Sequence, residues 1–143
     1  GKKNINGSIY YFNQEGVMQT GWKLMDKNWY DYSSSGAMKI GWVKDNEKWY
    51  YLDKEGIMQT GWKWFDNHYR YFESNGAMKT CWIKDKGRWY YLSPEDGIML
   101  VGLHKVNGNQ YYFEESGAMQ TSWKQIGNRL MVIGTISKQM VPC

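Results

Sequence analysis

Pairs of tryptophans recur along the chain at a fixed interval, and they are the residues best placed to do chemistry. The sequence has nine tryptophans in 143 residues, and Trp42 and Trp49 lie on either side of the polar segment DNEK. A short hairpin over these residues would bring the two rings side by side. Aromatic ring faces attract cations, so several rings around a space without a carboxylate are suited to a quaternary ammonium.

A third ring from the following repeat would complete a three-walled aromatic box. Side chains alternate across a strand, so Tyr50 and Leu52 are expected on the internal face and Trp49 and Tyr51 at the boundary with the next repeat. The predicted ligand-binding sets are Trp22, Trp29 and Tyr51; Trp42, Trp49 and Tyr71; Trp62, Tyr69 and Tyr91; and Trp82, Trp89 and Tyr112. The alternative is ordinary packing between repeats, which explains a tryptophan at either position but does not require both.

The two ends of the repeat array lack such a set. The first repeat has Lys2 and Ile9 in the ring positions, with Asp31 opposite. The sixth has Leu103 and Gln110. We therefore expect the end repeats to close the array rather than to bind.

The boxes must be positioned by a repeated unit, which fills the whole chain. Cutting the sequence at the recurrent Gly-Trp gives units 1–20, 21–40, 41–60, 61–80, 81–101 and 102–121, and a degenerate end, 122–143. A glycine and, two residues later, a methionine keep this register: Gly16, Gly36, Gly56, Gly76, Gly97 and Gly117, with Met18, Met38, Met58, Met78, Met99 and Met119. Repeats at such an interval indicate a stacked architecture with contacts between neighbours.

Each unit is predicted to form one β-hairpin. In the third unit, GWVK and WYYL are the strands and DNEK is the turn. Asn6-Gly7 and Asn107-Gly108 fall in the turn position, where Asn-Gly strongly favours a two-residue hairpin turn. No segment has a sustained helical period. The fold class is therefore all-β, a solenoid of stacked hairpins.

The repeated methionines have two interpretations. A flexible thioether fills gaps between hairpins well, which is the favoured role. The alternative is that Met58, Met78, Met99 and Met119 form the floor of the aromatic boxes.

The remaining residues do not form a pattern typical of catalysis or metal binding. His68 and His104 are far apart in sequence, with no Cys or carboxylate completing a metal set. Acids such as Asp45 and Asp85 fall in turns, where Asp is favoured for local hydrogen bonds. No nucleophile has a base at suitable spacing, and no glycine loop would hold a phosphate. We expect neither an enzyme, nor a metal, nor a cofactor.

Charge and hydropathy exclude further classes. The formal net charge is +4, but the lysines are scattered rather than aligned with the rings, which argues against single-stranded nucleic acid. No apolar run approaches the roughly 18 residues of a membrane span. Aromatic residues are 17% of the chain while the mean hydropathy is −0.73, as expected for rings with one dry and one wet side.

The cysteines and the tail leave alternatives open. Cys81 and Cys143 give no disulfide framework; Cys81 stands where neighbouring repeats have Gly, which favours substitution drift over a disulfide between the two. The tail keeps Trp123, and its apolar run LMVIGTI is expected to cap the open end. If exposed, this run would instead support a weak homodimer.

The units resemble a known family. GWVKDNEKWYYLDKEGIMQT is similar to the choline-binding repeats, or cell-wall-binding repeats, of streptococcal surface proteins and phage lysins. The resemblance covers essentially all of residues 1–143 as a single module and is strongest over 21–101. It implies a left-handed superhelix, with choline held between consecutive repeats by two Trp and one Tyr. Tyr69, in place of a Trp, is its weakest match among the four sets.

This resemblance also implies a function and a location. Such modules bind choline or phosphocholine on teichoic and lipoteichoic acids, so we expect a non-catalytic module of a secreted protein at the cell wall or bacterial surface. The alternative function is a glucan- or host-receptor-binding aromatic repeat, because related repeats bind sugars through similar rings. The presence of both tryptophans in units of 20 residues favours choline as the ligand.

Overall fold

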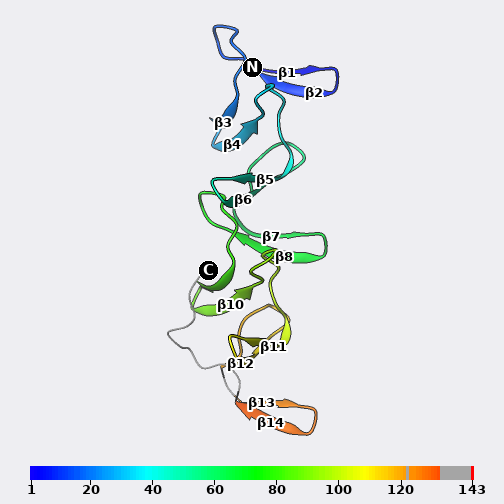
Figure 1. The fold of residues 1–143 in the computed structure, drawn as a ribbon, viewed down its shortest axis with the longest axis vertical. Coiled ribbons are helices and arrows are strands. Elements are labelled where there is room, and N and C mark those ends of the chain that lie inside the picture. Colours follow the sequence, from blue (N-terminus) through cyan, green and yellow to red (C-terminus); the bar gives the residue numbers. More distant parts are fainter. Residues whose placement is uncertain (122, 133–142) are drawn as a thin grey trace. The chain divides into compact units, whose positions relative to one another are not determined.

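Two-stranded hairpins make up the described secondary structure (Figure 1). The computed structural model describes residues 1–121, 123–132 and 143. The strands are β1 (Lys2–Ile5), β2 (Ser8–Tyr11), β3 (Gly21–Met25), β4 (Asn28–Tyr32), β5 (Gly41–Asp45), β6 (Lys48–Leu52), β7 (Gly61–Phe65), β8 (His68–Phe72), β9 (Cys81–Asp85), β10 (Arg88–Leu92), β11 (Gly102–Val106), β12 (Asn109–Phe113), β13 (Trp123–Ile126) and β14 (Arg129–Val132). Each pairs with its sequence neighbour. No helix occurs in these ranges, so the predicted all-β class of repeated hairpins is confirmed.

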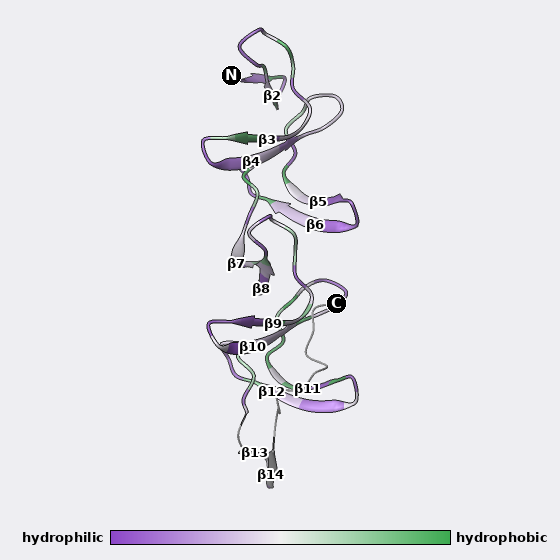
Figure 2. Cartoon of the chain, turned by 90° about the vertical axis from the view of Figure 1, so that its left-hand side faces the viewer, coloured by the Kyte–Doolittle hydropathy of each residue, from purple (hydrophilic) through white to green (hydrophobic). Residues whose placement is uncertain are grey.

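Two-residue turns with positive φ connect the strands. Asn6 and Gly7 have φ values of 53° and 87°, and Asn107 and Gly108 have values of 48° and 86°. Positive φ at both central residues matches the twist of the flanking strands, which explains the Asn-Gly pairs. The hairpin tips are hydrophilic, for example at β5–β6 and β11–β12 (Figure 2).

The repeated methionines connect successive hairpins through their backbone. The Met58 amide donates to the carbonyl of Trp29 at 2.9 Å, and the Met119 amide donates to that of Trp89 at 2.7 Å. The glycine register has a steric cause in the same place. A Cβ on Gly56, where φ is +84°, would lie 2.6 Å from the sulfur of Met38. A larger residue there would displace the methionine of the preceding repeat.

The chain divides into two compact units, one of Gly1–Gly61 with Phe72–Met78 and one of Trp62–Tyr71 with Lys79–Cys143. In the first unit, Leu52 is fully buried, as expected from strand alternation. In the second, Trp82, Val106, Phe113 and Met119 belong to one buried cluster. Each hairpin is too small to be stable alone and depends on such contacts with its neighbours.

The end of the chain differs from the expectation in two respects. Cys81 and Cys143 form a disulfide, where substitution drift was favoured. Cys81 is 3% exposed and has φ of 65°, a left-handed conformation that glycine adopts at the same position in other repeats. The tail also contains the hairpin β13–β14. Most of the apolar run assigned to a cap or dimer contact lies outside the described residues.

Within the described ranges, no helix has the length and apolar character needed to cross a bilayer.

Candidate functional site

A cavity lies where hairpin β5–β6 meets hairpin β3–β4. Trp22 and Trp29 come from β3 and β4, and the Tyr50 ring centroid lies 5.3 Å from that of Trp22. The cavity has a volume of about 280 Å³ and is lined by Trp22, Trp29, Asp45, Tyr50, Met58 and Asn75. Trp29 is 40% exposed, so the cavity is open to solvent. We call this set the Trp22 box.

The tyrosine that lies against Trp22 is Tyr50, where Tyr51 was expected. In the hairpin register Trp42 is opposite Tyr51, and the two rings are 5.1 Å apart. Tyr51 therefore shares the face of Trp42 and Trp49, which turns it away from the preceding hairpin. Tyr50 is on the opposite face, opposite Val43, and reaches back to Trp22.

The same correction applies in the second unit. Tyr90, rather than Tyr91, lies against Trp62 at 5.0 Å, and Tyr111, rather than Tyr112, lies against Trp82 at 4.9 Å. Tyr91 instead packs on Trp82 in its own hairpin. Strand alternation places the two tyrosines of each pair on opposite faces, but it does not say which face meets the preceding hairpin.

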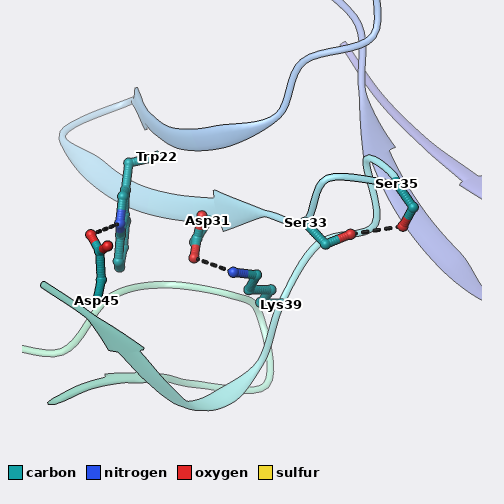
Figure 3. Close-up of polar contacts among 6 residues, drawn as sticks. All are labelled: Trp22, Asp31, Ser33, Ser35, Lys39 and Asp45. Carbon is teal, nitrogen blue, oxygen red and sulfur yellow. Dashed lines mark hydrogen bonds and ion pairs between the residues drawn. The ribbon is translucent and has the colours of Figure 1, made fainter. Parts of the chain in front are cut away.

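A carboxylate lies in the Trp22 box, contrary to the expectation of a box without one. The Trp22 indole Nε1–H donates to Asp45 Oδ2 at 3.1 Å (Figure 3). Asp45 is the last residue of β5, so the face that carries Tyr50 also carries this side chain. Asp31, opposite Trp22, is buried and forms an ion pair of 3.0 Å with Lys39 (Figure 3).

Trp62 has nearly the same surroundings. Its indole Nε1–H donates to Asp85 Oδ2 at 3.0 Å, and Tyr69 lies 6.5 Å from its ring. With Tyr90 these residues form the Trp62 box. Met99, predicted as packing or as a box floor, belongs to the buried cluster against which Trp62 and Tyr90 pack.

The second predicted set contains the tryptophan pair Trp42 and Trp49. Trp42 and Trp49 lie edge to face at 6.2 Å and are 38% and 40% exposed. The Met78 amide donates to the Trp49 carbonyl at 2.8 Å. Tyr71, the predicted third ring, packs on Trp62 in its own hairpin at 5.1 Å. A binding site at this pair therefore stays a prediction.

The fourth set is packed as a core. Trp82 and Trp89 lie 6.3 Å apart, but Trp82 is only 2% exposed and Val106 occupies the position that Asp45 has in β5. A cavity of about 370 Å³ reaches Trp89 and Met119, and Arg88 also lines it. Glu114 lines the same cavity and accepts a hydrogen bond from Arg88 at 2.8 Å, so the Arg88 charge is already paired there. We call the buried cluster of Cys81, Trp82, Tyr91, Val106, Tyr111, Phe113 and Met119 the Trp82 joint.

The first repeat carries its own cation. Lys2 occupies the register position of Trp22, and its Nζ lies 3.8 Å from the centroid of the Tyr30 ring. Tyr30 corresponds to Tyr50 in the next hairpin. An ammonium group thus lies over this ring within the protein itself, in the geometry of a cation–π interaction.

Residues 1–121, 123–132 and 143 give little support for metal binding. They contain no group of three or more His, Cys, Asp or Glu able to hold a metal ion. His104 Nε2 lies 2.9 Å from the Val101 carbonyl oxygen, and His68 is exposed.

Comparison with known proteins agrees with this geometry. A model of the choline-binding repeat matches residues 1–41, 39–80 and 59–101, and a cell wall binding repeat matches residues 102–119. A search of curated proteins found no match.

Solved structures also match. Choline binding protein F from Streptococcus pneumoniae is 40% identical over 89% of this chain and 44% of its own, with a TM-score of 0.86. CbpJ from the same species is 40% identical over 92% and 46%, also with a TM-score of 0.86. The cell wall endolysin from phage Cp-1, complexed with choline, is 29% identical over 94% and 41%, with a TM-score of 0.61.

The chain spans less than half the length of these structures. Family matches nevertheless extend over most of it, and the aromatic clusters fall between successive repeats. The chain belongs to the choline-binding repeat family.

Proposed function

We propose that the chain is a non-catalytic cell-wall-binding module that holds choline of teichoic and lipoteichoic acids in aromatic boxes between consecutive hairpins. It would thereby anchor a secreted protein at the bacterial surface. The observation that carries this proposal is the Trp22 box, an open cavity with three aromatic rings, the Met58 side chain and Asp45. Support comes from the matching phage endolysin, whose structure is of a complex with choline.

The size and lining of the Trp22 box suit a trimethylammonium group. Ring faces attract the cation without requiring it to donate hydrogen bonds, which a quaternary nitrogen cannot do. Each cation–π contact contributes about 0.5–2 kcal/mol. About 4 kcal/mol corresponds to a millimolar dissociation constant, so we expect weak individual sites.

Weak sites are sufficient if the ligand is a polymer. A chain that displays choline repeatedly offers the second box a high effective concentration once the first is filled, and avidity can exceed single-site affinity by about 10²–10⁴. We therefore expect firm retention on the wall and release by excess free choline.

Retention on choline-bearing cell walls tests the function. We expect the double variant Trp22→Ala with Trp42→Ala to lose a much larger fraction of its retention than the fraction of predicted boxes that it disables. The reason is that avidity falls steeply as the number of sites falls. Leu103→Ala is the matched control, since Leu103 is 40% exposed and occupies the register position of Trp22 in a hairpin without a box. Equal retention of both variants, or binding of walls that lack choline, would favour a glucan or host receptor as ligand.

A further inference from the structure

The two boxes that contain a carboxylate share one geometry. The indole nitrogens of Trp22 and Trp62 donate to Asp45 and Asp85 at 3.1 and 3.0 Å, and each acceptor lies 23 residues after its tryptophan. Both acids are the last residues of the first strand in the next hairpin. A turn acid with a purely local role would not repeat this contact with a different hairpin.

The carboxylate also marks the difference between a box and a joint. In β11 the same position holds Val106, which is 6% exposed beside a tryptophan that is 2% exposed. Asp45 is only partly buried and lines the cavity with Trp22, Trp29 and Tyr50. An ionised carboxylate attracts water and cations, whereas valine packs against the rings.

We propose that Asp45 and Asp85 determine the charge specificity of the Trp22 and Trp62 boxes, so that these boxes select a cationic ammonium over a neutral group of the same shape. This inference rests on the proposed choline-binding function. The indole hydrogen bond holds the carboxylate in place, and the second carboxylate oxygen contributes charge to the same site. Any cation in the Trp22 box lies within about one Debye length, 8 Å at physiological salt, of Asp45.

Other charged groups lie near the boxes, and two of the cations are paired with acids. Asp31 is the second carboxylate near Trp22, and Lys39 pairs with it at 3.0 Å. Lys48 is opposite Asp45 in the hairpin register, and Arg88 is opposite Asp85. Arg88 donates to Glu114 at 2.8 Å. Asp45 is thus the carboxylate that lines the Trp22 cavity.

The test removes the charge of the two carboxylates and keeps an oxygen that can accept the indole hydrogen bond. The double variant Asp45→Asn with Asp85→Asn retains an oxygen for both indoles. Asp26→Asn with Asp66→Asn is the matched control, because these exposed turn acids change the net charge equally and Asn tolerates their positive φ values of 49° and 53°. Calorimetry would measure binding of choline and of its neutral isostere, 3,3-dimethylbutan-1-ol, to the full chain.

We expect the Asp45 and Asp85 double variant to bind choline roughly three- to tenfold more weakly at these two boxes, the effect of one nearby charge in a partly solvated site. Its binding of the neutral isostere should not change, and the control should match the unmodified chain with both ligands. Equal weakening of choline and isostere would overturn the proposal, because the acids would then act only by positioning the rings. Equal choline affinity in the double variant and the control would also overturn it.

The unmodified chain separates this proposal from the function on which it rests. Choline binding that is insensitive to the two substitutions removes the charge role and leaves the proposed function intact. An unmodified chain that does not bind choline would overturn both.

Discussion

The Trp22 box and the Trp82 joint contain the same aromatic pattern in the same register, yet Trp22 lines an open cavity, whereas Trp82 is buried and the cavity beside it is lined by Trp89 and Met119. Trp22 faces Tyr50, Met58 and Asp45 around a space of about 280 Å³. Trp82 faces Tyr111 and is 2% exposed within a cluster that includes Val106. The rings alone therefore do not distinguish a binding site from packing.

The difference lies in the residues around the rings. Asp45 needs contact with water or a cation, so it favours an open site. Val106 and the buried Cys81, joined to Cys143, favour a closed one. Packing between repeats thus describes Trp82, whereas the open cavity at Trp22 has the form expected of a binding box.

The largest expected effect is on the free energy of unfolding, and it distinguishes the buried Trp82 from Trp22 in its open cavity. Trp82→Ala should lower the free energy of unfolding by about 3–5 kcal/mol, because it leaves a large cavity in a closed cluster. Trp22→Ala should cost clearly less, since its ring lines an open cavity. Urea unfolding followed by circular dichroism measures both, and equal losses would contradict the comparison.

The disulfide should make the second-largest contribution to the stability of the Trp82 joint. Cys143 is exposed, so Cys143→Ser removes the bond to Cys81 without removing a core side chain. The two cysteines are 62 residues apart, and closing a loop of this length in the unfolded chain stabilises the folded state by about 4 kcal/mol. Thermal unfolding with and without reductant checks this. A midpoint unaffected by either change would show that the bond does not constrain the chain.

The tyrosine assignment predicts a smaller and local effect. Tyr50→Ala should weaken choline binding at the Trp22 box by about 0.5–2 kcal/mol, the contribution of one ring face. Tyr51→Ala should leave this box unchanged, because Tyr51 packs on Trp42. The two can be separated by following each tryptophan by NMR, and a reversed pattern would restore Tyr51 as the third ring.

The smallest expected effect is on stability at alkaline pH, and it involves Tyr91 in the Trp82 joint. Burial, and secondarily the Glu95 charge, raises the pKa of Tyr91, whose hydroxyl donates to Cys81 Sγ at 3.7 Å. A raised pKa means that the folded state holds the proton more tightly than the unfolded state. The contribution of Tyr91 to the free energy of unfolding is therefore complete below about pH 10, the pKa of a tyrosine in the unfolded chain. It is lost as the pH rises through the higher pKa of the folded state.

Tyr91→Phe should make unfolding less dependent on pH above about 10, with a change at neutral pH of about 1 kcal/mol or less from the lost hydrogen bond. Chemical unfolding at neutral and alkaline pH provides the measurement. An unchanged slope in the variant would mean that Tyr91 does not titrate differently on unfolding.

The hairpins could be predicted from the sequence because their determinants are local. Asn6-Gly7 specifies a turn, and the alternation around Leu52 specifies a buried face. The role of Asp45 could not be predicted, because its bond to Trp22 depends on how one hairpin meets the next. Strand alternation already separates Tyr50 from Tyr51, but their orientation relative to the preceding hairpin requires the three-dimensional arrangement.

Choline titration followed at the indole Nε1–H signals of individual tryptophans tests the central claim most directly. Substitution of each tryptophan by Phe assigns its signal. We predict that the Trp22 and Trp62 signals shift and saturate at about millimolar choline, while the Trp82 signal stays constant because its ring is packed in a core. Unchanged Trp22 and Trp62 signals at high millimolar choline, or a Trp82 shift of the same size, would contradict this account.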